Sequence, residues 1–194
     1  STPIKSSAAS DVYKRQNKKW GTERKVADTF EGYDFPIIRY AEVLLNYAEA
    51  MYELGTTGKA LDDALNISLN LVRLRVNPDM PKLTTSFVSE NNLNMREEIR
   101  RERTIELYNE GFRIDDLKRW NTAIVEMPKP ILGVKWTGTD FATSWAGASN
   151  MAKDSDGCLI LENSRRWGSK NDLYPLPVDQ CQLNPNLGQN PGWQ

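Results

Sequence analysis

A loop rich in aromatic and planar polar side chains is the part of this sequence best suited to bind a ligand. Residues 133–150 hold Trp136, Phe141 and Trp145, with Asp140 and Asn150 among them. Flat aromatic faces stack on the C–H faces of sugar rings, while carboxylates and amides hydrogen-bond the ring hydroxyls. The composition therefore predicts a carbohydrate-binding platform built from these five side chains. The alternative is that the rings pack the loop onto the rest of the fold, the more frequent role of a single tryptophan.

Acidic residues alternate with arginines in residues 96–110. Two carboxylates could serve as the acid and the nucleophile of a glycosidase if their environments separated their pKa values. Neighbouring arginines instead lower the pKa of each carboxylate, so we interpret the cluster as a structural ion network and expect no catalytic residue. Arg103 shares a helix stripe with Ile99 and Leu107, where an ion needs a charged partner. The candidate partners are Glu106, Glu110, Glu42 and Glu49.

Composition argues against several classes of protein. The chain has no histidine, which removes the usual general base and the commonest zinc ligand, and we expect neither a metal nor a cofactor. Its 25 basic and 26 acidic residues give a net charge of −1, which indicates no nucleic-acid partner. No stretch is long enough for a spanning helix, so membrane association would require a lipid anchor or a partner.

Two smaller groups of residues allow more than one interpretation. Cys158 and Cys181 could pair in an oxidising compartment, but we expect buried free thiols. Asp154, Asp156 and Gly157 have the composition of a calcium loop, but the downstream acidic ligand is missing. This second group therefore favours a turn.

Periodic apolar residues predict a mainly α-helical fold. Residues 39–54 place polar and apolar side chains on opposite faces, and Gly55 closes this helix. Residues 59–75 predict a second helix that Pro78 ends, antiparallel to the first because the link between them is short. Two further helices are predicted over residues 92–110 and 114–126. The first hairpin has the pattern of one tetratricopeptide repeat, so we expect tetratricopeptide-like hairpins that stack on others.

Beyond Pro128 the sequence predicts long loops, a short β element and an ordered C-terminal wrap. Residues 158–162 favour a strand after a turn, with 165–167 or 173–174 as its partner. From residue 173 onward, prolines fix the backbone and asparagines and glycines favour turns, which predicts a non-helical wrap. The expected segments are a helical core over 38–126, a loop and strand region over 127–172, and the wrap over 173–194.

Three blocks of sequence, in this order, resemble the C-terminal part of the SusD/RagB-like family. They are RYAEVLLNYAEA at 39–50, RERTIELYNEGFRIDDLKRW at 101–120, and the tail with YPLP at 174–177 and NPNLGQNPGW at 184–193. The resemblance implies a non-catalytic, glycan-binding lipoprotein at the outer-membrane surface of Bacteroidetes. It also implies delivery of an oligosaccharide or polysaccharide to a SusC-like TonB-dependent transporter during nutrient uptake. The alternative is a tetratricopeptide-type protein-interaction module without sugar binding.

The N-terminal residues are expected to lie outside this family's domain. Family members are much longer, so we expect the chain to be a C-terminal fragment without the lipid-anchored part. Residues 6–16 resemble the translation of a sequencing adapter in one reading frame, and we assign residues 1–16 to an artefact or a disordered terminus. Residues 17–34 then form an extended lead-in to the C-terminal domain over 35–194.

Overall fold

The computed structural model describes Lys19 and residues 36–193, apart from the side chain of Ala146. The segments predicted as a terminal artefact and as an extended lead-in therefore lie outside the described residues, except for Lys19. The chain divides into two compact units, of which the first ends at Arg113 and the second begins at Ile114. This division falls within the range that the sequence analysis assigned to one helical core.

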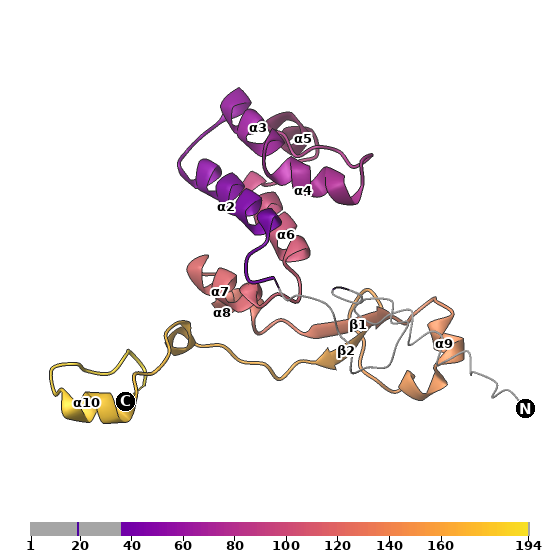
Figure 1. Cartoon of the computed structure of the whole chain (residues 1–194). Coiled ribbons are helices and arrows are strands. Elements are labelled where there is room, and N and C mark those ends of the chain that lie inside the picture. Colours follow the sequence, from indigo (N-terminus) through magenta and orange to yellow (C-terminus); the bar gives the residue numbers. More distant parts are fainter. Residues whose placement is uncertain (1–18, 20–35, 194) are drawn as a thin grey trace, which may run out of the picture. The chain divides into compact units, whose positions relative to one another are not determined.

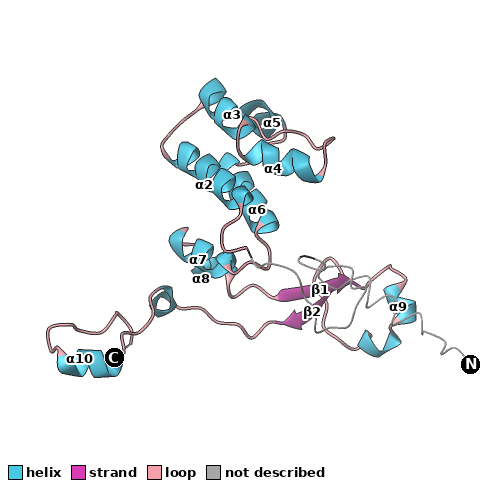
Figure 2. Ribbon diagram, in the orientation of Figure 1, coloured by secondary structure: helices cyan, strands magenta, loops and turns pink. Residues whose placement is uncertain are grey.

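The fold is mainly helical with one small sheet, as predicted (Figures 1 and 2). The first unit holds α2 (Tyr40–Glu53), α3 (Gly58–Asn66), α4 (Leu69–Val76), α5 (Thr85–Glu90) and α6 (Met95–Glu106). Helix α7 (Phe112–Arg119) spans the boundary, and the second unit continues with α8 (Ala123–Glu126), β1 (Ile131–Lys135), α9 (Phe141–Ser144), η1 (Ala146–Ala148), β2 (Cys158–Glu162), η2 (Ser169–Asp172) and α10 (Val178–Leu183). Among the described residues, no helix is both long and apolar enough to cross a bilayer.

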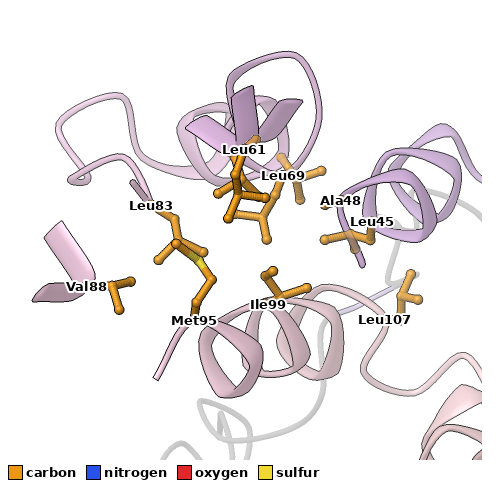
Figure 3. Close-up of a cluster of buried hydrophobic side chains, with 11 residues drawn as sticks. Leu45, Ala48, Leu61, Leu69, Leu83, Val88, Met95, Ile99 and Leu107 are labelled. Atoms are coloured by element: carbon orange, nitrogen blue, oxygen red, sulfur yellow. The ribbon is translucent and has the colours of Figure 1, made fainter. Parts of the chain in front are cut away.

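One apolar core holds the first unit together (Figure 3). Its buried side chains are Leu45, Ala48, Leu61, Leu65, Leu69, Val72, Leu83, Val88, Met95, Ile99 and Leu107. Helices this short are marginal alone, so their stability comes from burying these faces, at about 1.5–3 kcal/mol for each large aliphatic side chain. The amide of Asn70 is also buried, but it is satisfied because it bonds the backbone N–H and carbonyl of Leu83 at 2.7 and 2.9 Å.

The second predicted helix is in fact two helices, α3 and α4. The helix is interrupted at Ser68, whose backbone leaves the helical region at φ −136° and ψ −99°. The Ser68 hydroxyl donates a 2.6 Å hydrogen bond to the carbonyl of Ala64 one turn earlier. Serine competes with the helix ladder in this way, which apolar periodicity does not reveal. Helix α4 then ends just before Pro78, as predicted.

The third and fourth predicted helices are shorter than expected because asparagines end or begin them. Asn92 adopts a left-handed conformation at φ +52°, and the side chain of Asn94 caps α6 by accepting from the N–H of Glu97 at 3.2 Å. Asn121, at φ +56°, separates α7 from α8 in the same way. Asparagine tolerates this region of backbone space better than other non-glycine residues. A helix that the sequence analysis missed, α5, precedes α6.

Strand β2 lies where it was predicted, but its predicted partners are wrong. It pairs antiparallel with β1, with Leu132 opposite Ile160 and Lys135 opposite Cys158. The preceding turn is confirmed, because the carboxylate of Asp154 accepts from the N–H groups of Asp156 and Cys158 at 3.0 and 2.8 Å. The two cysteines are free thiols, half-buried rather than fully buried.

The C-terminal tail folds back on itself. The side chain of Gln189 bonds both backbone groups of Leu176, at 2.7 and 2.9 Å, and the amide of Asn190 donates to the carbonyl of Tyr174 at 2.6 Å. The Trp193 indole closes the loop by donating to the Leu173 carbonyl at 2.9 Å. The prediction of a wholly non-helical tail is wrong for α10, which starts directly after Pro177, where a missing N–H costs a helix nothing.

Candidate functional site

The predicted aromatic loop extends from the end of β1 and returns at β2 (Figure 1). Its base is closed by the carbonyl of Gly157, which accepts from the N–H groups of Trp136 and Thr137 at 2.8 and 3.1 Å. Gly157 has φ +80°, and a Cβ there would lie 2.5 Å from that of Thr137. Only glycine fits this crossing without a shift, so the base of the loop requires Gly157.

Trp136 is buried, with 6% of its surface exposed, and the Lys153 ammonium lies 5.7 Å from its ring centroid. A tryptophan that stacks on a sugar needs an open ring face. Trp136 has little such surface in this structure and matches the alternative interpretation, in which the ring packs the loop. Its place at the closed base of the loop makes it a support for the residues that follow.

Trp145 is the exposed aromatic residue of the loop, with 44% of its surface accessible. Its backbone N–H donates to the carbonyl of Phe141 at 2.9 Å, so Trp145 directly follows α9, one turn after Phe141. Phe141 is half-buried, whereas Asp140 and Asn150 are exposed. Asp140 precedes α9, but in the described structure its carboxylate does not cap that helix. Four of the five predicted side chains thus retain accessible surface at or near α9.

The arginine and glutamate cluster forms an ion network in the first unit, centred on Arg39. The Arg39 guanidinium binds both carboxylate oxygens of Glu110 at 2.7 and 2.8 Å and one oxygen of Glu106 at 2.9 Å. These hydrogen bonds, chiefly with Glu110, raise the pKa of Arg39. Arg75 binds the other side of Glu106 at 2.8 Å. The predicted network is therefore present, although its centre was not foreseen.

Arg103 is buried as predicted, and one of its polar contacts is with an amide. Its guanidinium donates to the side-chain oxygen of Asn46 at 2.7 Å and lies 5.5 Å from the ring centroid of Phe112. Glu106 ends α6 and Glu110 follows four residues later, and these two nearby carboxylates were the signal for a second arginine. A pair of carboxylates suits a forked guanidinium.

Glu102 corrects the expectation that arginines lower the pKa of every carboxylate in the cluster. Burial raises its pKa, and the attraction of Arg73, at 3.3 Å, opposes this only in part. Arg73 and Glu102 are both buried, and neither lines the pocket of about 560 Å³ nearby. That pocket is bounded by Arg39, Tyr40, Ala41, Leu44, Leu71, Val72 and Arg75. None of these is acidic, so in the described structure the pocket has no carboxylate for general acid catalysis.

Comparisons with known proteins agree on one family. A family model described as the SusD family matches residues 1–193. A SusD-like carbohydrate binding protein from Bacteroides fragilis NCTC 9343 is 31% identical, with a TM-score of 0.59 over 79% of this chain and 28% of that one. The selenomethionine form of BT4246 is 26% identical, with a TM-score of 0.58 over 83% of this chain and 25% of that one.

The chain thus spans about a quarter of the length of these two solved structures. None of the curated proteins compared with it matches. The family match extends over nearly the whole sequence and agrees with the three blocks of residues that resemble the family. The mainly helical fold agrees with the two structural neighbours. These findings show that the chain belongs to the SusD family.

Proposed function

We propose that this chain is part of a non-catalytic glycan receptor of the outer membrane, lipid-anchored at the cell surface in the full-length protein. In this role it delivers oligosaccharides or polysaccharides to a SusC-like TonB-dependent transporter. Membership of the SusD family and the carbohydrate-binding description of one neighbour support the receptor role. The single observation that carries the proposed site is the exposed ring of Trp145, which directly follows α9.

The proposed contacts divide between stacking and hydrogen bonding. Trp145 and the edge of Phe141 stack on sugar C–H faces, and Asp140 and Asn150 bond hydroxyl groups. Trp136 supports the base of the loop. A non-catalytic role agrees with the ion pairs of the first unit. The carboxylates of Glu106 and Glu110 are bound by arginines, which leaves them engaged in structure. Glycoside hydrolysis needs two carboxylates flanking the bond, and the non-catalytic role requires none.

A glycan array followed by calorimetry on the purified chain tests this proposal. We expect Trp145→Ala to weaken binding of the selected glycan about tenfold, or about 1.4 kcal/mol, because part of the apolar ring surface is lost. Met151→Ala is the matched control, since Met151 is a similarly exposed apolar residue of the same segment. The melting temperature should change little in both variants. Equal affinities for the two variants would remove Trp145 from the site.

A protein-interaction role is the second candidate, and a specific surface favours it. Tyr40, Val43 and Tyr47 are exposed at helical spacing along α2, next to the pocket of about 560 Å³. An apolar stripe of this kind fits the apolar face of a partner helix. In this case, replacing Tyr40 and Tyr47 by serine would abolish binding of the partner and leave glycan affinity unchanged. A loss of glycan affinity in that variant would contradict the division of roles.

A further inference from the structure

A second group of aromatic side chains lies in the C-terminal part of the second unit, next to two lysines. The Lys118 ammonium, from α7, lies 3.9 Å from the ring centroid of Tyr174 and 5.8 Å from that of Trp167. The Lys170 ammonium lies 4.8 Å from the ring centroid of Trp193. Lys118 thus contacts two rings and Lys170 a third, and these five residues are here called the lysine–aromatic cluster.

Hydrogen bonds hold two of the three rings of this cluster in place, those of Trp167 and Trp193. The Trp167 indole N–H donates to the carboxylate of Asp172 at 2.9 Å. The Trp193 indole N–H donates to the carbonyls of Lys170 and Leu173 at 2.8 and 2.9 Å. A ligand that stacks on these rings would not need to order them first. Preorganised rings bind at a lower entropic cost than mobile ones.

Tyr174 offers the most open surface of the cluster. It is 73% exposed although the Lys118 ammonium covers one ring face, so the opposite face is open to solvent. Within the described part of the chain its hydroxyl has no hydrogen-bond partner, so it can act as a donor or an acceptor at the ring edge. The residue therefore presents both groups that a sugar ring contacts, an apolar face and a polar edge.

The cluster carries positive charge that no carboxylate in the described structure neutralises by an ion pair. Neither Lys118 nor Lys170 has a carboxylate within ion-pair distance among the described residues, and their close contacts are with ring faces. The one acid in the cluster, Asp172, accepts the indole N–H of Trp167. An ammonium over a ring keeps its N–H donors for a further anionic group.

We infer that the lysine–aromatic cluster binds acidic saccharides, whose sugar rings bear carboxylate or sulfate groups. The sugar ring stacks on the open face of Tyr174, and its anionic group reaches past the ring edge to the Lys118 ammonium, which donates a charge-assisted hydrogen bond. Lys170, over Trp193, adds a second positive charge to the cluster. This inference rests on the proposed glycan-binding function and adds the charge of the ligand. It concerns a surface separate in sequence from the α9 loop.

Calorimetry with two matched tetrasaccharides tests this inference on the purified chain. Tetragalacturonate supplies the carboxylates, and its fully methyl-esterified form has the same linkages without the charge. We expect at least tenfold tighter binding of the acid, and weaker binding at higher salt because exposed charges are screened. A heparin-derived tetrasaccharide, measured in parallel, distinguishes preference for sulfate from preference for carboxylate.

Three variants assign the binding to the cluster. The double variant Lys118→Gln with Lys170→Gln should bind tetragalacturonate at least tenfold more weakly, and so should Tyr174→Ala. Lys59→Gln is the matched control, because Lys59 is an exposed lysine of the other unit. Equal affinity for the two galacturonates, absence of binding by both acidic probes, or an unchanged double variant would overturn the inference. The receptor proposal is decided independently, by whether any glycan of the array binds, and its α9 site by the effect of Trp145→Ala on that glycan.

Discussion

Removal of Arg39 should destabilise the first unit far more than removal of an exposed cation. Arg39 forms a bidentate pair with Glu110 and a further bond to Glu106. The three side chains are only 18%, 9% and 11% exposed, so solvent screens these pairs weakly. Loss of one partner costs about 3–5 kcal/mol in buried ion pairs and about 0–1 kcal/mol in exposed ones. Because the cluster is largely but not fully buried, we expect Arg39→Met to cost about 2–3 kcal/mol.

Urea unfolding of the purified chain, followed by circular dichroism, measures this loss. With an m-value of about 2 kcal/mol per M, the midpoint should fall by about 1–1.5 M. Lys59→Met provides the control, because it also removes one positive charge from an ion pair. Lys59 pairs with Asp63 one turn away, with side chains 85% and 60% exposed, so its loss should cost less than about 0.5 kcal/mol. Equal midpoint shifts in the two variants would refute the assignment of Arg39 as the centre of the network.

Three further changes test other parts of the fold. Burial raises the pKa of Glu102 above its ordinary value of 4.5, so the folded state holds the proton more tightly than the unfolded state does. The contribution of Glu102 to the free energy of unfolding therefore falls as the pH rises from 4.5 through the raised pKa. Glu102→Gln should remove this decline in urea titrations at successive pH values, and an unchanged pH profile would count against it. Gly157→Ala should lower the free energy of unfolding, measured by thermal unfolding, by about 1–3 kcal/mol, because its Cβ would meet Thr137 and its φ is positive. Gly147→Ala is the control and should change it little, because the space around Gly147 is open. Trp193→Ala should speed limited proteolysis within residues 170–193, while unaltered cleavage would show that the indole does not hold the tail closed.

The helical elements were the most predictable part of the fold, and side-chain hydrogen bonds explain the errors. Periodicity located α2 correctly, since its apolar face alone determines which side is buried. It could not reveal the break at Ser68, which depends on a hydroxyl bonded to the carbonyl of Ala64. Strand β1 was missed because its five residues, with a central glycine, carry no alternating pattern. Helix α10 was missed because the surrounding prolines and asparagines favoured turns.

The sequence selected a candidate loop, but it did not predict which of the loop's rings are exposed. Composition selected the α9 loop, yet it treated Trp136 and Trp145 alike, and the structure buries the first and exposes the second. That difference depends on the closure of the loop at Gly157, a contact between residues distant in sequence. The lysine–aromatic cluster was not predicted, because Lys118 approaches Tyr174 only through the fold. Sequence composition shows which side chains are available, whereas long-range contacts decide which of them face solvent.

The closed tail loop has a consequence for the order in which this protein folds. Its ties join residues that are 13 to 23 positions apart: Leu176 with Gln189, Tyr174 with Asn190, and Trp193 with Leu173 and Lys170. The entropy of closing a chain segment grows only with the logarithm of its length, and short segments close in well under a millisecond. The tail can therefore close at once, without waiting for any contact from the helical unit. Slow steps in refolding should therefore arise elsewhere in the chain, in the assembly of its long-range contacts.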